Sequence, residues 1–216
     1  GAPGVGTTYF VDYQGVRYIV MAGASAIELG TMAQQTRWLD QTLASSKATW
    51  NVVLFHQPVF TCARPDDTPE IKAAWQPVFE SRKVDLVLQG HDHCYSRLTS
   101  EAGRAASAEV RADGAVQGPV YLVSVTGSKM YGLNDRARTQ PDKTAEATEL
   151  YQIVDVAGDR LAFRTYTASG KLYNGFDLHK RADGNHLTDT TEPTIAQRTC
   201  TGNVGPDGGK CVARAK

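Results

Sequence analysis

Apolar and polar positions alternate in strand-sized and helix-sized patterns over the first fifty residues. Residues 9–11 and 16–21 are apolar runs separated by the turn-like segment Asp-Tyr-Gln-Gly, which predicts a β-hairpin. Apolar residues then recur near helical spacing between Met32 and Leu43, and they predict a helix there.

A strand–helix–strand unit is predicted next. Residues 51–55 and 84–88 are short apolar runs of the kind found in buried parallel strands. Between them, Thr68 and Pro69 are typical of a helix start, as the cap and the first helical residue. An apolar stripe follows at positions i, i+3, i+4, i+7 and i+8, which predicts a helix to Arg82: Ile71, Ala74, Trp75, Val78 and Phe79.

The rest of the chain predicts antiparallel strands followed by a polar tail. The stretch Thr99 to Gln117 is polar and alanine-rich and predicts a long loop. From about Arg181 onward the sequence is polar and predicts loops, so we expect a domain over residues 1–180 and a C-terminal extension over 181–216. Strands are predicted over residues 119–125, 150–156, 160–166 and 171–178, with turns at 157–159 and 168–170.

Composition narrows the class of protein. Hydrophobic residues make up 41% and charged residues 21% of the chain, as in globular domains. The 23 basic and 23 acidic residues cancel, and no basic block stands out, so we expect no nucleic-acid partner and no membrane-surface partner. The apolar runs are strand-sized and predict no membrane-spanning segment.

The four cysteines allow three full pairings. Cys200 and Cys211 bracket a polar, glycine-rich segment, which favours a disulfide over two free thiols and, with it, an oxidising compartment such as the cell exterior or the periplasm. Cys62 and Cys94 follow His56 and His93 respectively by a few residues, and these histidines are candidate metal ligands. The two cysteines are expected to approach each other if those ligands converge, and thiolate ligation is the competing interpretation.

Three histidines follow the two predicted parallel strands. His56 comes directly after residues 51–55, while His91 and His93 come after residues 84–88, with Gly90 allowing a sharp turn before them. Ligands bind outside the carboxyl ends of strands in open α/β sheets, and neutral imidazole is a good ligand for transition metals. A surface or hydrogen-bonded role is the alternative for each histidine, but their joint placement favours a metal site.

These segments resemble the last two motifs of the calcineurin-like metallophosphoesterases, and in particular the purple acid phosphatase branch. The resemblance rests on Phe-His-Gln-Pro at 55–58, on Val-Asp-Leu-Val-Leu-Gln-Gly-His-Asp-His at 84–93, and on Tyr95 and Arg97. It extends over roughly residues 8–180. It implies an α/β fold, half of an α/β/β/α sandwich, in which a mixed sheet and a β-α-β unit carrying the histidines precede antiparallel strands.

The resemblance also implies a function. It predicts hydrolysis of a phosphate monoester or diester by a dinuclear centre of iron, zinc or manganese. His56 and His91 would bind one metal and His93 the other, and Asp92 would either face away or brace the loop. Tyr95 and Arg97 match family positions where packing is expected, and Arg97 is also a candidate for a contact with the substrate phosphate.

The family's earlier motifs are not found upstream of His56. These are Asp-x-His, Gly-Asp-x-x-Asp and Gly-Asn-His followed by an acid. Gly184-Asn185-His186 spells part of the third far downstream, with Leu187 in place of the acid, and we interpret it as a turn. We therefore expect residues 1–180 to be the C-terminal part of a catalytic domain. Its partner would be the missing N-terminal half, without which the chain is expected to be inactive.

Two other classes of protein remain open. One is a different His-x-His metallohydrolase, such as an amidohydrolase; the helix predicted to end at Arg82 argues against a cupin. The other is a non-catalytic module that keeps the metallophosphoesterase fold and binds a partner or a carbohydrate.

Overall fold

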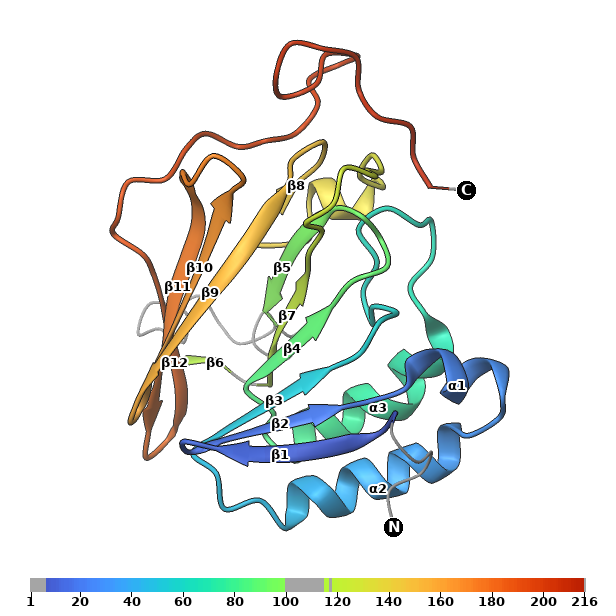
Figure 1. Ribbon diagram of the computed structural model, residues 1–216, viewed down its shortest axis with the longest axis vertical. Helices are drawn as coiled ribbons and strands as arrows, with labels where there is room; N and C mark the ends of the chain where they lie inside the picture. The colour runs from blue at the N-terminus through green and yellow to red at the C-terminus, as the bar shows by residue number, and fades with distance from the viewer. Residues whose placement is uncertain (1–6, 100–114, 117, 216) are drawn as a thin grey trace.

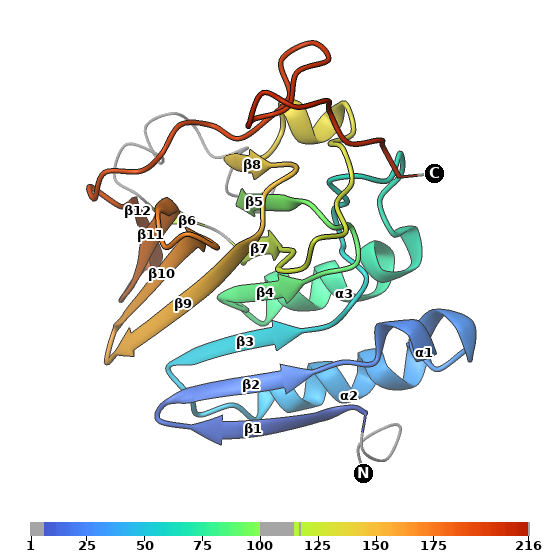
Figure 2. The same ribbon diagram turned by 45° about the horizontal axis from the view of Figure 1, so that its top comes forward.

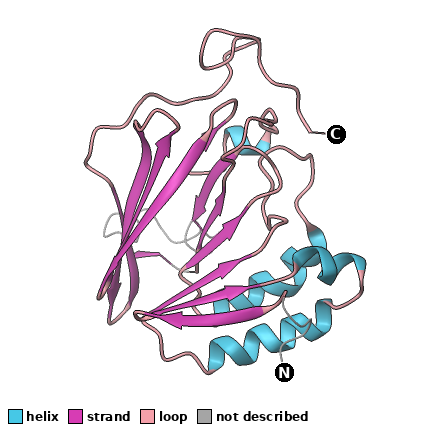
Figure 3. Ribbon diagram, viewed as in Figure 1, coloured by secondary structure: helices cyan, strands magenta, loops and turns pink. Residues whose placement is uncertain are grey.

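Two β-sheets face each other, and helices cover the outer side of the larger sheet (Figures 1 and 3). The computed structural model describes residues 7–99, 115–116 and 118–215. Three helices lie together on that outer side: α1 (Gly23–Glu28), α2 (Met32–Ala44) and α3 (Pro69–Ser81). None of the described helices combines the length and the apolar content needed to cross a membrane.

The larger sheet has the strand order β1-β2-β3-β4-β7-β5-β8. Strands β2, β3, β4 and β7 run parallel, while β1 and β5 run antiparallel to β2 and β7 respectively. The strands are β1 (Tyr9–Tyr13), β2 (Val16–Val20), β3 (Trp50–Leu54), β4 (Leu86–Gln89), β5 (Tyr95–Thr99), β7 (Val120–Val123) and β8 (Lys143–Ala145).

The smaller sheet is antiparallel throughout, in the order β6-β12-β11-β10-β9. Its strands are β6 (Ala115–Val116), β9 (Leu150–Ala157), β10 (Arg160–Thr167), β11 (Leu172–Arg181) and β12 (Gly184–Asp189), and a 3-10 helix, η1 (Arg136–Arg138), precedes β8. Figure 2 shows the two sheets diverging like the sides of a wedge, with β9 at the edge of the smaller sheet and β1 at the edge of the larger.

The apolar core has two layers. Between helices and sheet, Trp75 and Phe79 of α3 are fully buried, and Phe55 meets the Trp75 ring edge-on at 5.1 Å between centroids. Between the sheets, Phe163 and Phe176 stack at 5.1 Å, and the buried Trp50 donates its indole N–H to the Gly158 carbonyl at 2.9 Å. The second layer therefore joins the β-α-β part of the chain to the later hairpins.

Most predicted elements are confirmed: the first hairpin, helices α2 and α3, and the strands from β3 to β11 that the apolar runs predicted. The prediction of loops alone after Arg181 is wrong, because β12 pairs along β11. This strand is polar because it contributes only Leu187, partly buried, to the core between the sheets. Helix α1 and strands β5, β6 and β8 were not predicted. Strand β6 falls inside the loop expected between Thr99 and Gln117, most of which lies outside the described residues.

Candidate metal centre

The pairing of β3 with β4 brings His56 beside His91. The two strands are parallel, and hydrogen bonding continues past their ends, where the Gly90 amide donates to the His56 carbonyl at 3.0 Å. The Nε2 atom of His56 lies 2.9 Å from the Nδ1 atom of His91, and the two rings are nearly perpendicular, at 77°. His56 is exposed and His91 is partly exposed, so the pair lies at the surface of the described structure.

The separation of these nitrogens suits two ligands of one metal. Metal–imidazole bonds of about 2.0–2.1 Å at tetrahedral or octahedral angles place neighbouring ligand nitrogens roughly 2.8–3.4 Å apart. A hydrogen bond between the two rings has a similar length when one of the nitrogens carries a proton. The pair therefore fits a metal ion without rearrangement of its backbone.

The backbone at the histidines is left-handed, with φ of 68° at His91 and 51° at His93. Such values are uncommon for residues other than glycine and cost free energy that the surroundings must offset. The sequence suggested that Gly90 would take the sharp turn, but its φ is not positive. A Cβ added there would lie 3.8 Å from Nδ1 of His56, an ordinary contact, so the strain is carried by the histidines themselves.

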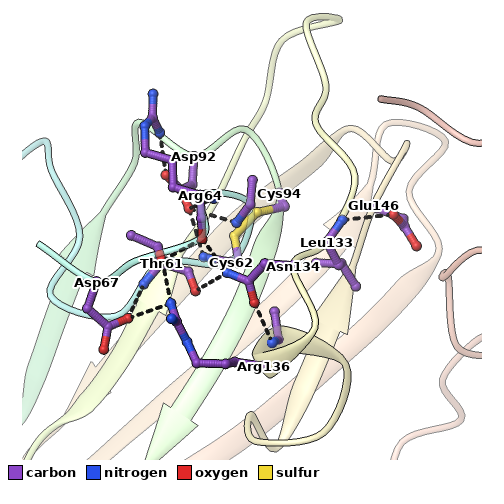
Figure 4. The surroundings of a disulfide bond; sticks show 12 residues. Thr61, Cys62, Arg64, Asp67, Asp92, Cys94, Leu133, Asn134, Arg136 and Glu146 are labelled. Atoms are coloured by element: carbon purple, nitrogen blue, oxygen red, sulfur yellow. Dashed lines mark hydrogen bonds and ion pairs between the residues drawn. A yellow bond between two sulfur atoms is a disulfide. The ribbon is translucent and has the colours of Figure 1, made fainter. Parts of the chain in front are cut away.

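Asp92 holds this loop in place. Its fully buried carboxylate accepts hydrogen bonds from the backbone amides of Cys62 and Ala63, both at 2.7 Å, and of Arg64 at 3.3 Å. The Arg64 guanidinium also donates to it (Figure 4). The predicted bracing role of Asp92 is confirmed, and it fixes the loop after β3 to the loop after β4.

A disulfide between Cys62 and Cys94 reinforces the same junction, with the Cα atoms 6.2 Å apart (Figure 4). The expected approach of these cysteines is confirmed. Cys62, Asp92 and Cys94 form a cluster of possible ligands in the described part of the chain, but the disulfide leaves no thiolate there, so thiolate ligation is wrong. The predicted disulfide between Cys200 and Cys211 is also present.

His93 points to a different neighbour. Its Nδ1 atom lies 2.8 Å from the Lys129 carbonyl oxygen, and its ring lies 5.1 Å from the ring of Tyr131. A carbonyl oxygen can only accept, so this contact favours the proton on Nδ1 and leaves Nε2 without one, an arrangement common among metal-binding histidines. Among the described residues, no third His, Cys, Asp or Glu ligand atom lies within 4.8 Å of both His56 and His91. The structure thus brings His56 and His91 into contact, whereas His93 contacts the Lys129 carbonyl oxygen instead.

The surroundings of His91 favour its neutral form. Burial lowers the pKa of His91, and the positive charges of Arg64 and His56 lower that pKa further. The neutral ring, the form that binds metals, is therefore favoured. The sequence did not point to Arg64, because its only local signal is a lone cation near a cysteine. Its partner Asp92 lies 28 residues away.

Tyr95 and Arg97 lie on β5 and are buried. The Tyr95 hydroxyl receives a hydrogen bond from Asn174 at 2.8 Å, and burial raises the pKa of Tyr95. Arg97 donates to Asp189 at 2.7 Å, and its guanidinium lies over the Phe176 ring, 5.3 Å from the centroid. These are packing contacts, as expected for both residues. A contact between Arg97 and a substrate phosphate stays a prediction.

The segment Gly184-Asn185-His186 opens strand β12, while the turn itself occupies residues 182–183. Asn185 donates to Asp85 at 2.6 Å, just before β4, whereas His91 follows the other end of that strand. A four-residue strand is about 13 Å long at roughly 3.3 Å per residue. Asn185 therefore lies at the end of the sheet away from the histidines.

Comparison with known proteins shows which family this chain resembles. Residues 3–95 match the family model of the calcineurin-like phosphoesterases. The chain is 25% identical to purple acid phosphatase 4 of Arabidopsis thaliana over 147 residues and 28% identical to purple acid phosphatase 7 of the same plant over 149 residues. Each match covers 67% of this chain. Residues 3–95 therefore carry calcineurin-like metallophosphoesterase sequence, and the chain is related to purple acid phosphatases.

The fold agrees as well. A purple acid phosphatase from seeds of yellow lupin, Lupinus luteus, superposes with a TM-score of 0.65 at 18% identity, over 82% of this chain and 33% of that one. The mixed sheet and the antiparallel sheet described above are thus arranged as in that protein. The matched region spans 39% and 40% of the lengths of the two Arabidopsis relatives.

Proposed function

We propose that this chain contributes the histidine side of a dinuclear metal centre that hydrolyses phosphate esters. His56 Nε2 and His91 Nδ1 would hold one metal, and His93 Nε2 the second. The observation that carries the proposal is the 2.9 Å approach of the first two nitrogens, on a loop held in left-handed backbone. When bound, iron, zinc or manganese ions would polarise the phosphoryl group and lower the pKa of a water molecule.

Arg64 is our candidate for the phosphate contact. Its side chain is 30% exposed and donates one N–H group to Asp92, which leaves further donors of the planar fork available. It is close enough to His91 to lower the pKa of that residue. Arginine suits phosphate oxygens through paired hydrogen bonds, so Arg64 would orient the ester beside the histidines.

We propose that the remaining metal ligands come from polypeptide outside this chain, the N-terminal half of the catalytic domain in the relatives. Three imidazoles carry no charge to balance two metal ions, and in the described residues the one carboxylate next to the histidines, Asp92, is occupied by its own hydrogen bonds. The match to only about two fifths of each Arabidopsis relative supports the same view.

Two apolar edge strands support this proposal too. All five residues of β1 are exposed, including Tyr9, Phe10 and Val11 at 46%, 42% and 49%. On β9, Tyr151 and Ile153 are 40% and 45% exposed. Exposed apolar edges are templates for pairing with another polypeptide. Each of the two strands is the edge strand of its sheet (Figure 2), so an added strand could extend either sheet.

Calorimetric titration with zinc tests the histidine assignment. His56→Ala and His91→Ala should each weaken binding by more than the ~10–100-fold typical when a ligand loses only its hydrogen-bond partner. His179→Ala, on β11, is the matched control and should bind zinc as the parent chain does. Equal affinity in the parent chain and the two site variants would remove the basis of the proposal.

An assay with an aryl phosphate tests the need for a second half. The 216-residue chain with metal should show no turnover, whereas the chain joined to the N-terminal half should hydrolyse the ester. Substantial turnover by the chain alone would contradict the shared centre. Lack of metal in the joined protein would favour a non-catalytic binding module instead.

The two disulfides support an oxidising compartment, so we propose a secreted or periplasmic location. Thiol alkylation of the protein taken directly from its source checks this proposal. No cysteine should react before reduction, and all four should react after it.

A further inference from the structure

A groove lies beside the candidate metal centre, between the C-terminal extension and the ends of the later strands. It encloses about 890 Å³, within the range of small-molecule sites. Its walls come from the loop after β7, the segment between β8 and β9, the turn between β10 and β11, and the extension around residues 195–198 and 206–207.

The C-terminal extension is fixed in place as one wall of this groove. Buried Glu146 accepts a hydrogen bond from the Cys200 amide at 2.7 Å, and its own amide donates to the Arg198 carbonyl at 2.9 Å. Further along, the Gly132 amide donates to the Ala213 carbonyl at 2.8 Å. Figures 1 and 2 both show the extension arching over this end of the molecule.

The groove adjoins the loop that contacts His93. Ser128 and Met130 line it, and the residue between them, Lys129, supplies the carbonyl oxygen that lies 2.8 Å from Nδ1 of His93. Residues 128–130 therefore border both His93 and the groove.

The described residues that line the groove include polar and charged side chains but no aromatic ring. No aromatic side chain is among the described residues that line the groove, so a nucleobase or an aryl group has nothing to stack on. Arg198 is neutralised by Asp207 at 2.5 Å. Glu149 and Lys171 are exposed, and among the described contacts neither charged group has an ion-pair partner, so an acceptor and a donor are both available to a ligand.

We propose that this groove binds the alcohol portion of the substrate as a hydroxylated, non-aromatic group, such as the sugar of a sugar phosphate. Lys171 and Glu149 hydrogen-bond its hydroxyl groups, while Met130 and Ile195 provide apolar contact for its carbon skeleton. This inference rests on the proposed function, because it assigns the substrate class of that centre. The groove itself is formed by this chain alone.

Nuclear magnetic resonance tests the inference on the metal-free 216-residue chain. Glucose 6-phosphate should shift the backbone amide signals of Thr148, Ser169, Lys171 and Gln197, whereas 4-nitrophenyl phosphate should leave them in place. Lys171→Ala should weaken glucose 6-phosphate binding about tenfold, as loss of a hydrogen bond to a charged group implies. Lys171→Arg should retain most of the affinity.

Lys47→Ala is the matched control, since Lys47 is an exposed lysine in the loop between α2 and β3. It should bind glucose 6-phosphate as the parent chain does. The inference is overturned if glucose 6-phosphate shifts no groove amide at millimolar concentration, if the aryl ester shifts the same amides, or if Lys171→Ala binds equally well. The zinc titrations of the His56 and His91 variants report separately on the proposed function.

Discussion

The Nε2 atom of His56 and the Nδ1 atom of His91 lie 2.9 Å apart although 35 residues separate them in sequence. Two features produce this approach. Parallel pairing of β3 and β4 brings the two residues to the same edge of the sheet. The left-handed backbone at His91 then directs its ring toward His56. Because that backbone conformation is unfavourable for histidine, the geometry depends on the contacts that hold the loop, above all those of Asp92.

We predict that Asp92→Asn destabilises the protein by about 2–4 kcal/mol and weakens zinc binding roughly 10–100-fold. The oxygen that now accepts from the Cys62 and Ala63 amides would lose its negative charge, and an NH₂ group would face the Arg64 guanidinium. Urea unfolding and calorimetric titration measure the two effects. Asp159→Asn, in an exposed turn, should change neither, and an unchanged zinc affinity in Asp92→Asn would show that the brace is not needed for the site.

We predict that the metal-free His93 ring carries its proton on Nδ1, because the Lys129 carbonyl oxygen lies 2.8 Å from that atom and can only accept. Nitrogen chemical shifts of the imidazole measure the tautomer directly at a pH where the ring is neutral. His179 serves as the comparison, since it has no such carbonyl partner among its described contacts. A neutral His93 ring protonated mainly on Nε2 would mean that the wrong nitrogen had been assigned as the ligand atom.

The sequence predicted the parts of this protein that depend on local pattern. The stripe of Ile71, Trp75 and Phe79 predicted a helix because side chains at that spacing share one face, and all three are buried. Placement of His56 and His91 after neighbouring parallel strands predicted their convergence, because the carboxyl ends of such strands meet at one edge of the sheet.

Other parts depend on contacts that leave no local pattern. The bonds from Cys62 and Ala63 to Asp92 span 30 and 29 residues. Nothing around Arg64 distinguished it from a solvated surface cation, and its role emerged only from its position next to Asp92. Strand β12 was not predicted because a strand that buries little apolar surface has the sequence pattern of a polar loop. The groove could not be predicted from local pattern either, because one of its walls is formed by an extension far along the chain.

We predict that Glu146→Gln loosens the C-terminal extension at a cost of about 2–4 kcal/mol. The carboxylate accepts from the Leu133 amide at 2.9 Å and from the Cys200 amide at 2.7 Å, and it lies 3.3 Å from Arg138. In glutamine an NH₂ group would face one of these donors and leave it unpaired. Hydrogen exchange should show faster exchange at the amides of Leu133 and Cys200. Glu149→Gln, at an exposed position, is the control; slow exchange at Cys200 in Glu146→Gln would contradict the prediction.

The last prediction concerns acid stability. Burial alone would raise the pKa of Asp177, but hydrogen bonds from Arg164 and Arg160 outweigh it and lower that pKa below the usual value. Arg164 donates to it at 2.7 Å and Arg160 at 2.9 Å. A carboxyl group whose pKa is lower in the folded state stabilises that state at pH values above its unfolded pKa. The stabilisation is lost as the pH falls through the folded pKa.

We therefore expect Asp177→Asn to lower the free energy of unfolding by about 1–2 kcal/mol at pH 7. The difference from the parent chain should stay constant down to about pH 4 and shrink below it, since the parent carboxylate then takes up a proton. Urea unfolding at a series of pH values measures this trend. Asp155→Asn, exposed on β9, should not reproduce it. A difference that stayed constant well below pH 3 would show that the two arginines stabilise Asp177 through packing and not through its charge.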